Sequence, residues 1–306
     1  MSSHPTVAFI GLGHMGGPMA ANLVEAGVAV RGFDVVPAAM EAARSSGVHV
    51  VDDPLEAVAA AEVVLTMLPS GRHVLSAYQD SPGLLSAARP GTIFLDCSTI
   101  NISEAQQAAR LVQEAGFRAA DAPVSGGVVG AEAGTLAFMV GASEEVFAEV
   151  EPLLDIMGAR AVHCGTNGLG QAAKICNNMI LGVTQIAVGE AFVLGEKLGL
   201  EHQALYDVVS KASGQCWALT TNCPVPGPVP TSPANRGYEP GFAGALMDKD
   251  LTLAVTALQE QGVAASMGPL AAEVYAEFAS GEGARQDFSA IINTIREKST
   301  PNPPAA

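Results

Sequence analysis

Short apolar runs rich in β-branched residues alternate with helix-like stretches from Thr6 to about His163. This alternation is typical of a parallel sheet that helices cover on both faces. We therefore expect an α/β, doubly wound sheet in this half of the chain. The predicted strands are Val7–Ile10, Ala29–Phe33, Val48–Val51, Val63–Met67, Thr92–Leu95, Arg118–Ala120, Leu136–Val140 and Ala161–His163.

The second half has a helical period. From Gln171 to Leu198 no Pro or strong stop interrupts the sequence, which predicts a helix of about 28 residues. Apolar residues lie on nearly every side of its first half, so we expect it to be buried all round at the centre of an all-α domain. The resulting division is an α/β domain over 1–164, an all-α domain over 165–298 and a disordered tail over 299–306. Four further helices are expected: Glu201–Ala212, Gly244–Gln261, Gly268–Ser280 and Phe288–Lys298.

A glycine-rich turn joins the first strand to the first helix. Gly11, Gly13 and Gly16 form the Gly-x-Gly-x-x-Gly pattern that binds a dinucleotide pyrophosphate at a helix N-terminus, which indicates a Rossmann-type domain. Asp34 closes the second strand, where its carboxylate can bind ribose hydroxyls and repel a 2′-phosphate, so NAD is favoured over NADP. Other candidate cofactor contacts lie in the turn or at strand ends: Leu12, His14, Met15, Leu68, Pro69 and Thr99.

Two features suit a small organic acid. Ser125, Gly126 and Gly127 follow the sixth strand, and their hydroxyl and successive N–H groups would suit a carboxylate, although a plain Gly-rich turn has the same composition. Lys174 lies near the start of the long helix among apolar residues, so it must be paired, reach solvent or be functional. Asn178 lies four residues later, on the same helix face.

Four motifs, in this order, resemble those of the β-hydroxyacid dehydrogenases: Val7–Met19, Asp121–Gly127, Gly165-x-x-Gly168-x-Gly170-x-x-x-Lys174-x-x-x-Asn178, and Lys249–Asp250. Lys174–Met179 and Cys216–Gly227 are most similar to the family members that oxidise 3-hydroxyisobutyrate to methylmalonate semialdehyde in valine degradation. Cys223 departs from that pattern, which has Asn there.

The resemblance implies an NAD-dependent dehydrogenase with its active site between the cofactor domain and the helical domain. Lys174 would be catalytic, as a general base or acid or as a cationic stabiliser of an oxyanion, and Asn178 would position the substrate. Ser125, Gly126 and Gly127 would hold the substrate carboxylate, and Lys249 would approach the nicotinamide. The pocket would be lined or closed by Trp217, Phe242 and Asp250. A homodimer or homotetramer is also implied.

Composition narrows the alternatives. The 306 residues carry a formal net charge of −16, which disfavours nucleic-acid and anionic membrane partners. The five cysteines form no C-x-x-C pair and the N-terminus has no presequence pattern, so we expect a cytoplasmic protein; the six histidines lack metal-ligand spacing. Two alternatives stay open. One is a dehydrogenase or reductase of another small acid, such as tartronate semialdehyde, succinate semialdehyde or serine, and the other is a catalytically silent NAD-binding scaffold.

Overall fold

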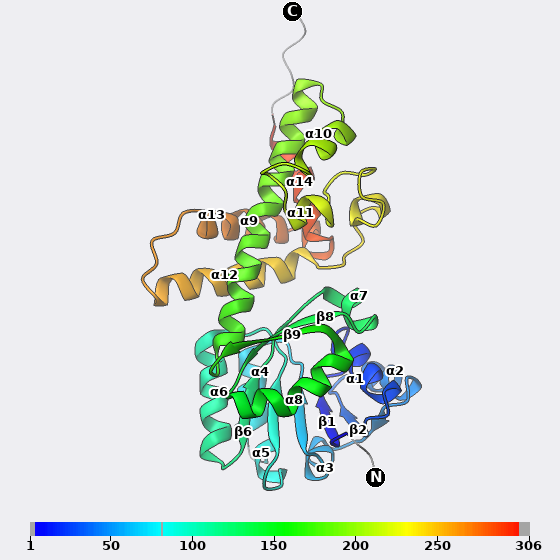
Figure 1. The fold of residues 1–306 in the computed structure, drawn as a ribbon, viewed down its shortest axis with the longest axis vertical. Coiled ribbons are helices and arrows are strands. Elements are labelled where there is room, and N and C mark those ends of the chain that lie inside the picture. Colours follow the sequence, from blue (N-terminus) through cyan, green and yellow to red (C-terminus); the bar gives the residue numbers. More distant parts are fainter. Residues whose placement is uncertain (1–3, 81, 300–306) are drawn as a thin grey trace, which may run out of the picture. The chain divides into compact units, whose positions relative to one another are not determined.

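The computed structural model describes residues 4–80 and 82–299. The first half forms one sheet with the order β3-β2-β1-β4-β5-β6-β8-β7, and β9 pairs with β8 (Figure 1). Strands β1 to β6 are parallel, whereas β8 runs antiparallel to β6 and β7. The doubly wound sheet that the sequence predicts is confirmed. Its strands are β1 Val7–Ile10, β2 Val30–Phe33, β3 His49–Val50, β4 Val63–Thr66, β5 Ile93–Asp96, β6 Arg118–Asp121, β7 Val124–Ser125, β8 Leu136–Gly141 and β9 Gly158–Gly165.

Helices connect these strands and cover both faces of the sheet. They are α1 Gly16–Glu25, α2 Pro37–Ser45, α3 Pro54–Ala59, α4 Gly71–Gln79, α5 Leu84–Ala87, α6 Ile102–Glu114, α7 Gly127–Glu132 and α8 Glu144–Met157. Successive strand residues point to opposite faces. Val7 and Phe9 therefore pack in the core that α1 and α8 cover, while Ala8 and Ile10 pack in the core beneath α3, α4 and α6.

The second half is all helical. Its elements are α9 Leu169–Leu198, α10 His202–Val209, α11 Trp217–Thr220, η1 Pro233–Arg236, α12 Gly244–Glu260, α13 Met267–Ala279, η2 Glu282–Arg285, η3 Phe288–Ala290 and α14 Ile291–Lys298. The proline-rich segment 223–232 before η1 contains no regular helix, because proline lacks the N–H group that a helix interior requires. In the predicted tail, Ser299 is described and its hydroxyl donates to the Ile295 carbonyl over 2.7 Å; residues 300–306 lie outside the described part.

The long helix α9 has 30 residues, close to the predicted length. The expectation that its first half is buried all round is wrong. Cys176, Asn177 and Ile180 are exposed, because the described part of the chain covers only one side of the helix there. By length and mean hydropathy α9 is the one described helix that could cross a membrane, a criterion that core helices of globular enzymes also meet; 44% of that window is buried within the protein.

Backbone contacts divide the chain into two compact units, Met1–Lys174 and Ile175–Ala306. The division falls within the first turns of α9, ten residues beyond the boundary expected from the sequence. Each unit has its own core: the first surrounds the sheet, and the second is built on residues of α9, α12, α13 and α14.

Candidate functional site

The glycine turn has the geometry of a phosphate-binding loop. Gly11 follows β1 with a φ of +99°, and a Cβ there would lie 2.3 Å from the Met67 carbonyl oxygen. A Cβ on Gly16, the first residue of α1, would lie 1.9 Å from the Gly11 carbonyl oxygen. A Cβ on Gly13, in contrast, would meet no atom within 4 Å. Internal packing thus requires glycine at two positions, whereas the third leaves open space above the turn.

This turn fits a dinucleotide. The first turn of α1 has no acidic residue and no side-chain cap, so its N–H groups and positive dipole end suit a phosphate. The Asp34 carboxylate fixes the turn, because its Oδ2 accepts from the Leu12 N–H over 2.6 Å and its Oδ1 accepts from the Val36 N–H over 2.8 Å. Each carboxylate oxygen keeps a lone pair for a ribose hydroxyl.

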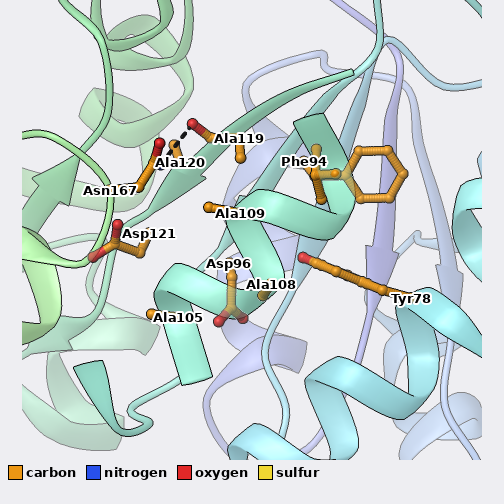
Figure 2. Close-up of a pocket in the computed structure, with 11 residues that line it drawn as sticks. Tyr78, Phe94, Asp96, Ala105, Ala108, Ala109, Ala119, Ala120, Asp121 and Asn167 are labelled. Atoms are coloured by element: carbon orange, nitrogen blue, oxygen red, sulfur yellow. Dashed lines mark hydrogen bonds between the residues drawn. The ribbon is translucent and has the colours of Figure 1, made fainter. Parts of the chain in front are cut away.

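A polar row crosses the carboxyl ends of three neighbouring strands. Thr66, Asp96 and Asp121 end β4, β5 and β6 and are register partners, so they share one face of the sheet. Asp96 and Asp121, together with Tyr78 and Asn167, border a cavity of about 10 Å³, room for roughly one water molecule (Figure 2). Burial raises the pKa of both carboxyl groups from 3.8 to about 6, and for Asp96 the neighbouring charge of Asp121 adds to the increase.

Asp121 and Gln171 anchor the start of α9. Asp121 Oδ1 accepts from the Gly168 N–H over 2.6 Å, and Oδ2 accepts from the Gln171 N–H over 3.0 Å. The Gln171 amide donates to the Ser98 carbonyl over 2.7 Å and accepts from the Ile100 N–H over 3.2 Å. Lys174, less than one turn further along, is only 5% exposed. These bonds fix the backbone that carries the candidate catalytic lysine.

The predicted acid-binding loop is a tight turn. β7 ends at Ser125, which pairs with Ala137 of β8. Gly126 has a φ of +134° and Gly127 a φ of +63°. Both lie in the left-handed region that residues with a Cβ avoid. Gly126 is exposed, and Ser125 and Gly127 on either side of it are half-buried.

In the second unit the structure brings Asn178 and Asp250 together. The Asn178 side chain, 1% exposed, donates to the Asp250 carboxylate and accepts from Asn177 over 2.9 Å. Lys249 and Asp250 are neighbours on α12. Phe242 packs edge-to-face on Phe288, with ring centroids 5.6 Å apart.

A buried carboxylate shapes the loop that carries Phe242. Asp287 Oδ2 accepts from the Gly241 and Phe242 N–H groups, each over 3.1 Å, and its Oδ1 accepts from Asn222 over 3.2 Å. Trp217, at the start of α11, is 51% exposed. It therefore does not pack in the core of this unit.

The sequence-predicted site residues fall in both units. The cofactor turn, Asp34, Leu68, Pro69, Thr99, Ser125–Gly127 and Lys174 belong to the first, and Asn178, Trp217, Phe242, Lys249 and Asp250 belong to the second. Sequence reasoning missed Asp96 and Gln171. For Asp96 the sequence did contain a signal: Asp96 and Asp121 each come directly after a predicted strand, at the edge where such sheets bind ligands. The sequence has no comparable signal for Gln171. No group of three or more potential metal ligands occurs in the described residues.

Comparison with known proteins agrees with this geometry. Residues 6–165 match the model for the NAD binding domain of 6-phosphogluconate dehydrogenase, and residues 168–295 match the model for the NAD-binding domain of NADP-dependent 3-hydroxyisobutyrate dehydrogenase. A probable 3-hydroxyisobutyrate dehydrogenase of Mycobacterium tuberculosis is 54% identical over 96% of this chain and 98% of the relative. The NAD-dependent L-serine dehydrogenase of Pseudomonas aeruginosa is 43% identical over 93% of this chain and 96% of the relative.

A solved structure extends the likeness to three dimensions. The 3-hydroxyisobutyrate dehydrogenase of Mycobacterium tuberculosis, described with L-serine, has a TM-score of 0.92 at 54% identity and covers 96% of this chain and 99% of its own. Fold and turn define an NAD(P)-dependent oxidoreductase with a Rossmann-type domain followed by a helical domain. More specifically, the chain belongs to the 3-hydroxyisobutyrate dehydrogenase family.

Proposed function

We propose that this enzyme oxidises 3-hydroxyisobutyrate to methylmalonate semialdehyde with NAD, a step of valine degradation. The observation that supports this choice of substrate is the 54% identity, over nearly the whole chain, to a probable 3-hydroxyisobutyrate dehydrogenase. The carboxylate of Asp34 at the end of β2 supports NAD over NADP, because it would repel a 2′-phosphate. The cofactor domain would comprise residues 1–164 and the substrate domain residues 165–298.

The predicted site residues have three roles in this reaction: cofactor binding, substrate binding and catalysis. The turn Gly11–Gly16 (with Leu12, His14 and Met15), Asp34, Leu68, Pro69, Thr99 and Lys249 hold the cofactor, and Ser125–Gly127 binds the substrate carboxylate. When bound, NAD would accept the hydride that leaves the carbinol carbon of the substrate. Lys174 takes the hydroxyl proton or, as a cation, stabilises the oxyanion. Asn178, held by Asp250, orients the hydroxyl, and Trp217 and Phe242 border the pocket.

The test is a substrate panel. NADH or NADPH formation is measured at neutral and alkaline pH with (S)-3-hydroxyisobutyrate, L-serine, D-glycerate and 4-hydroxybutyrate, with NAD and NADP in parallel. We expect the highest kcat/KM for 3-hydroxyisobutyrate with NAD. A clear preference for another acid would change the assigned substrate but leave the proposed reaction type in place. NAD binding without any turnover would favour a catalytically silent scaffold.

L-Serine is the second candidate substrate. Two observations favour it: the 43% identity to an NAD-dependent L-serine dehydrogenase, and the structural relative described with L-serine. Both molecules carry a primary hydroxyl on the carbon β to a carboxylate, so one site can present either to the same lysine. The ratio of their kcat/KM values decides between them.

The proposal extends to the oligomeric state and the cellular location of the enzyme. We propose a homodimer or homotetramer in the cytoplasm, supported by exposed apolar residues on α9 and by five cysteines without a disulfide. The excess of acidic residues argues against nucleic-acid and anionic membrane partners.

A further inference from the structure

Asp96 lies at the centre of a buried hydrogen-bond network in the first unit. Its Oδ1 accepts three bonds: from Thr66 Oγ1 over 2.8 Å, from Ser98 Oγ over 2.6 Å and from the Ser98 N–H over 3.2 Å. Its Oδ2 is buried at the cavity and has no hydrogen-bond partner in the described part of the chain. A carboxyl group is costly to bury, so the position of Asp96 needs a reason beyond packing.

Ser98 extends the network in two directions. Its hydroxyl, which donates to Asp96, accepts from the Leu68 N–H over 2.8 Å and so fixes the loop after β4. Its carbonyl accepts from the Gln171 side chain and so fixes the first turn of α9. The first connection leads to a proposed cofactor loop, and the second leads to the backbone just before Lys174.

We propose that Asp96 is a positioning residue, which through Ser98 holds the Leu68–Pro69 cofactor loop and the first turn of α9 in register. The role rests on the proposed function, since it assumes that these two segments bind NAD and carry the catalytic lysine. The ionised carboxylate orients the Ser98 hydroxyl as a donor toward Asp96, which leaves the lone pairs of Ser98 Oγ for Leu68. Protonation of the carboxyl group removes the negative charge that holds the Ser98 hydroxyl on Oδ1, so this hydroxyl, which is also the acceptor of the Leu68 N–H, is held less firmly.

The network therefore responds to pH. The titratable groups that face Asp96 are Asp121 on β6, Tyr78 on α4 and the adjacent Cys97. The alanines of α6 that border the same cavity carry no charge. Burial raises the pKa of Asp96 to about 6, so it changes charge in mildly acidic solution. Asp121 titrates in the same range and needs its own variant as a control.

Three variants separate the connections. Ser98→Ala removes the acceptor of Leu68 but keeps the carbonyl that binds Gln171, and we expect the Kd for NAD to rise about tenfold, the worth of one buried hydrogen bond. Gln171→Met removes the two side-chain bonds that join α9 to Ser98 and Ile100 and keeps the bond to Leu68, and we expect kcat to fall about tenfold with the Kd for NAD unchanged. The matched control is Thr92→Val at the opposite end of β5, which loses a buried bond to the Ala61 carbonyl and leaves both values unchanged.

Hydrogen exchange of the protein without cofactor gives a readout that needs no activity. We expect faster exchange at Leu68 in Ser98→Ala, and at Gly168–Lys174 in Gln171→Met. In the wild type, after correction for intrinsic rates, exchange at Leu68 should accelerate and the Kd for NAD should rise below about pH 6. The Asp96→Asn variant should lose this pH response, whereas Asp121→Asn should keep it.

Unchanged exchange in both variants would overturn the proposal, as would an unchanged Kd for NAD in Ser98→Ala. It would also be overturned by a wild type whose exchange at Leu68 shows no pH response, or by a response that survives Asp96→Asn. The wild-type pH series requires no variant, so a variant that fails to fold leaves the test decisive. If no hydroxy acid is oxidised but the exchange pattern is as expected, the proposed function fails while the coupling through Asp96 stands.

Discussion

Lys174 is a buried basic residue near the start of α9, 5% exposed, in a protein with twice as many acidic as basic residues. We expect Lys174→Met to lower kcat by about 10²–10⁴, the usual contribution of a positioned proton-transfer or oxyanion group. The Kd for NAD should change by less than about twofold. Steady-state kinetics and calorimetry with NAD measure the two quantities.

The Lys174→Arg variant tests how the lysine acts. Arginine keeps the charge but does not release a proton near neutral pH. Turnover close to that of the wild type would leave only the cationic role, whereas activity as low as in Lys174→Met would support proton transfer. A Lys174→Met enzyme with more than about a tenth of the wild-type kcat would contradict both roles.

Asp121 makes stability depend on pH. Because the pKa of its carboxyl group is about 6 in the folded chain and 3.8 ordinarily, the folded state holds the proton more tightly. Its contribution to stability is therefore fully present below about pH 4 and is lost as the pH rises through 6. The shift corresponds to about 3 kcal/mol.

The Asp121→Asn variant isolates this contribution. The unfolding free energy of the wild type, relative to that of the variant, should fall by about 2 kcal/mol between pH 4 and pH 7. Urea unfolding at several pH values measures the difference. The variant also loses hydrogen bonds at the start of α9, so the slope with pH, and not the offset, carries the information. If the unfolding free energies of the wild type and the variant change in parallel with pH, the raised pKa of Asp121 is contradicted.

In the turn between β1 and α1, packing requires glycine at position 16, whereas glycine at position 13 leaves open space for a ligand. Gly16→Ala places a Cβ 1.9 Å from a carbonyl oxygen, so it should lower the unfolding free energy by at least about 2 kcal/mol. Gly13→Ala meets no atom within 4 Å and should change stability by less than about 0.5 kcal/mol, yet raise the Kd for NAD at least about tenfold. Thermal unfolding and calorimetry with NAD compare the variants. A Gly13→Ala protein that binds NAD normally would show that the dinucleotide does not approach this residue.

The elements differ in how far the sequence predicts them. Local periodicity and turn residues suffice for the sheet and for α9, whose observed bounds differ from the expected ones by a few residues. They fail for β7, because two residues paired with β8 carry no periodic signal. They also fail for the burial of α9, since composition shows that a helix is apolar but not which neighbours cover it.

The candidate site is predictable to a similar degree. The glycine turn and Asp34 follow from local spacing, and the structure places them together. The bonds of Asp96 and Gln171 join residues 30 and about 73 positions apart, so only the folded sheet reveals them. Backbone contacts between distant strands decide which polar residues meet, and no single segment contains that information.

At the scale of the whole molecule, the uncovered face of α9 points to association. Ile180 is 61% exposed, Leu194 59% and Leu198 76%. With exposed Cys176, Ala187 and Ala191 they recur at helical spacing and form one stripe along the helix. An apolar stripe of this length marks a protein interface more often than a free surface. The stripe thus supports the proposed homo-oligomer.

The net charge of the chain predicts how association between copies depends on salt. Copies that each carry a formal charge of −16 repel one another, and salt screens that repulsion over about 10 Å at 0.1 M. If the interface is the apolar stripe, raising the salt concentration should strengthen association, which light scattering after size exclusion measures as mass against protein concentration. Leu194→Glu with Leu198→Glu should shift the equilibrium to smaller species, and Glu114→Gln, at an exposed position on α6 in the first unit, serves as the control. Association that weakens with salt would indicate an interface held by opposite charges, and association that survives the double variant would place the interface away from the stripe.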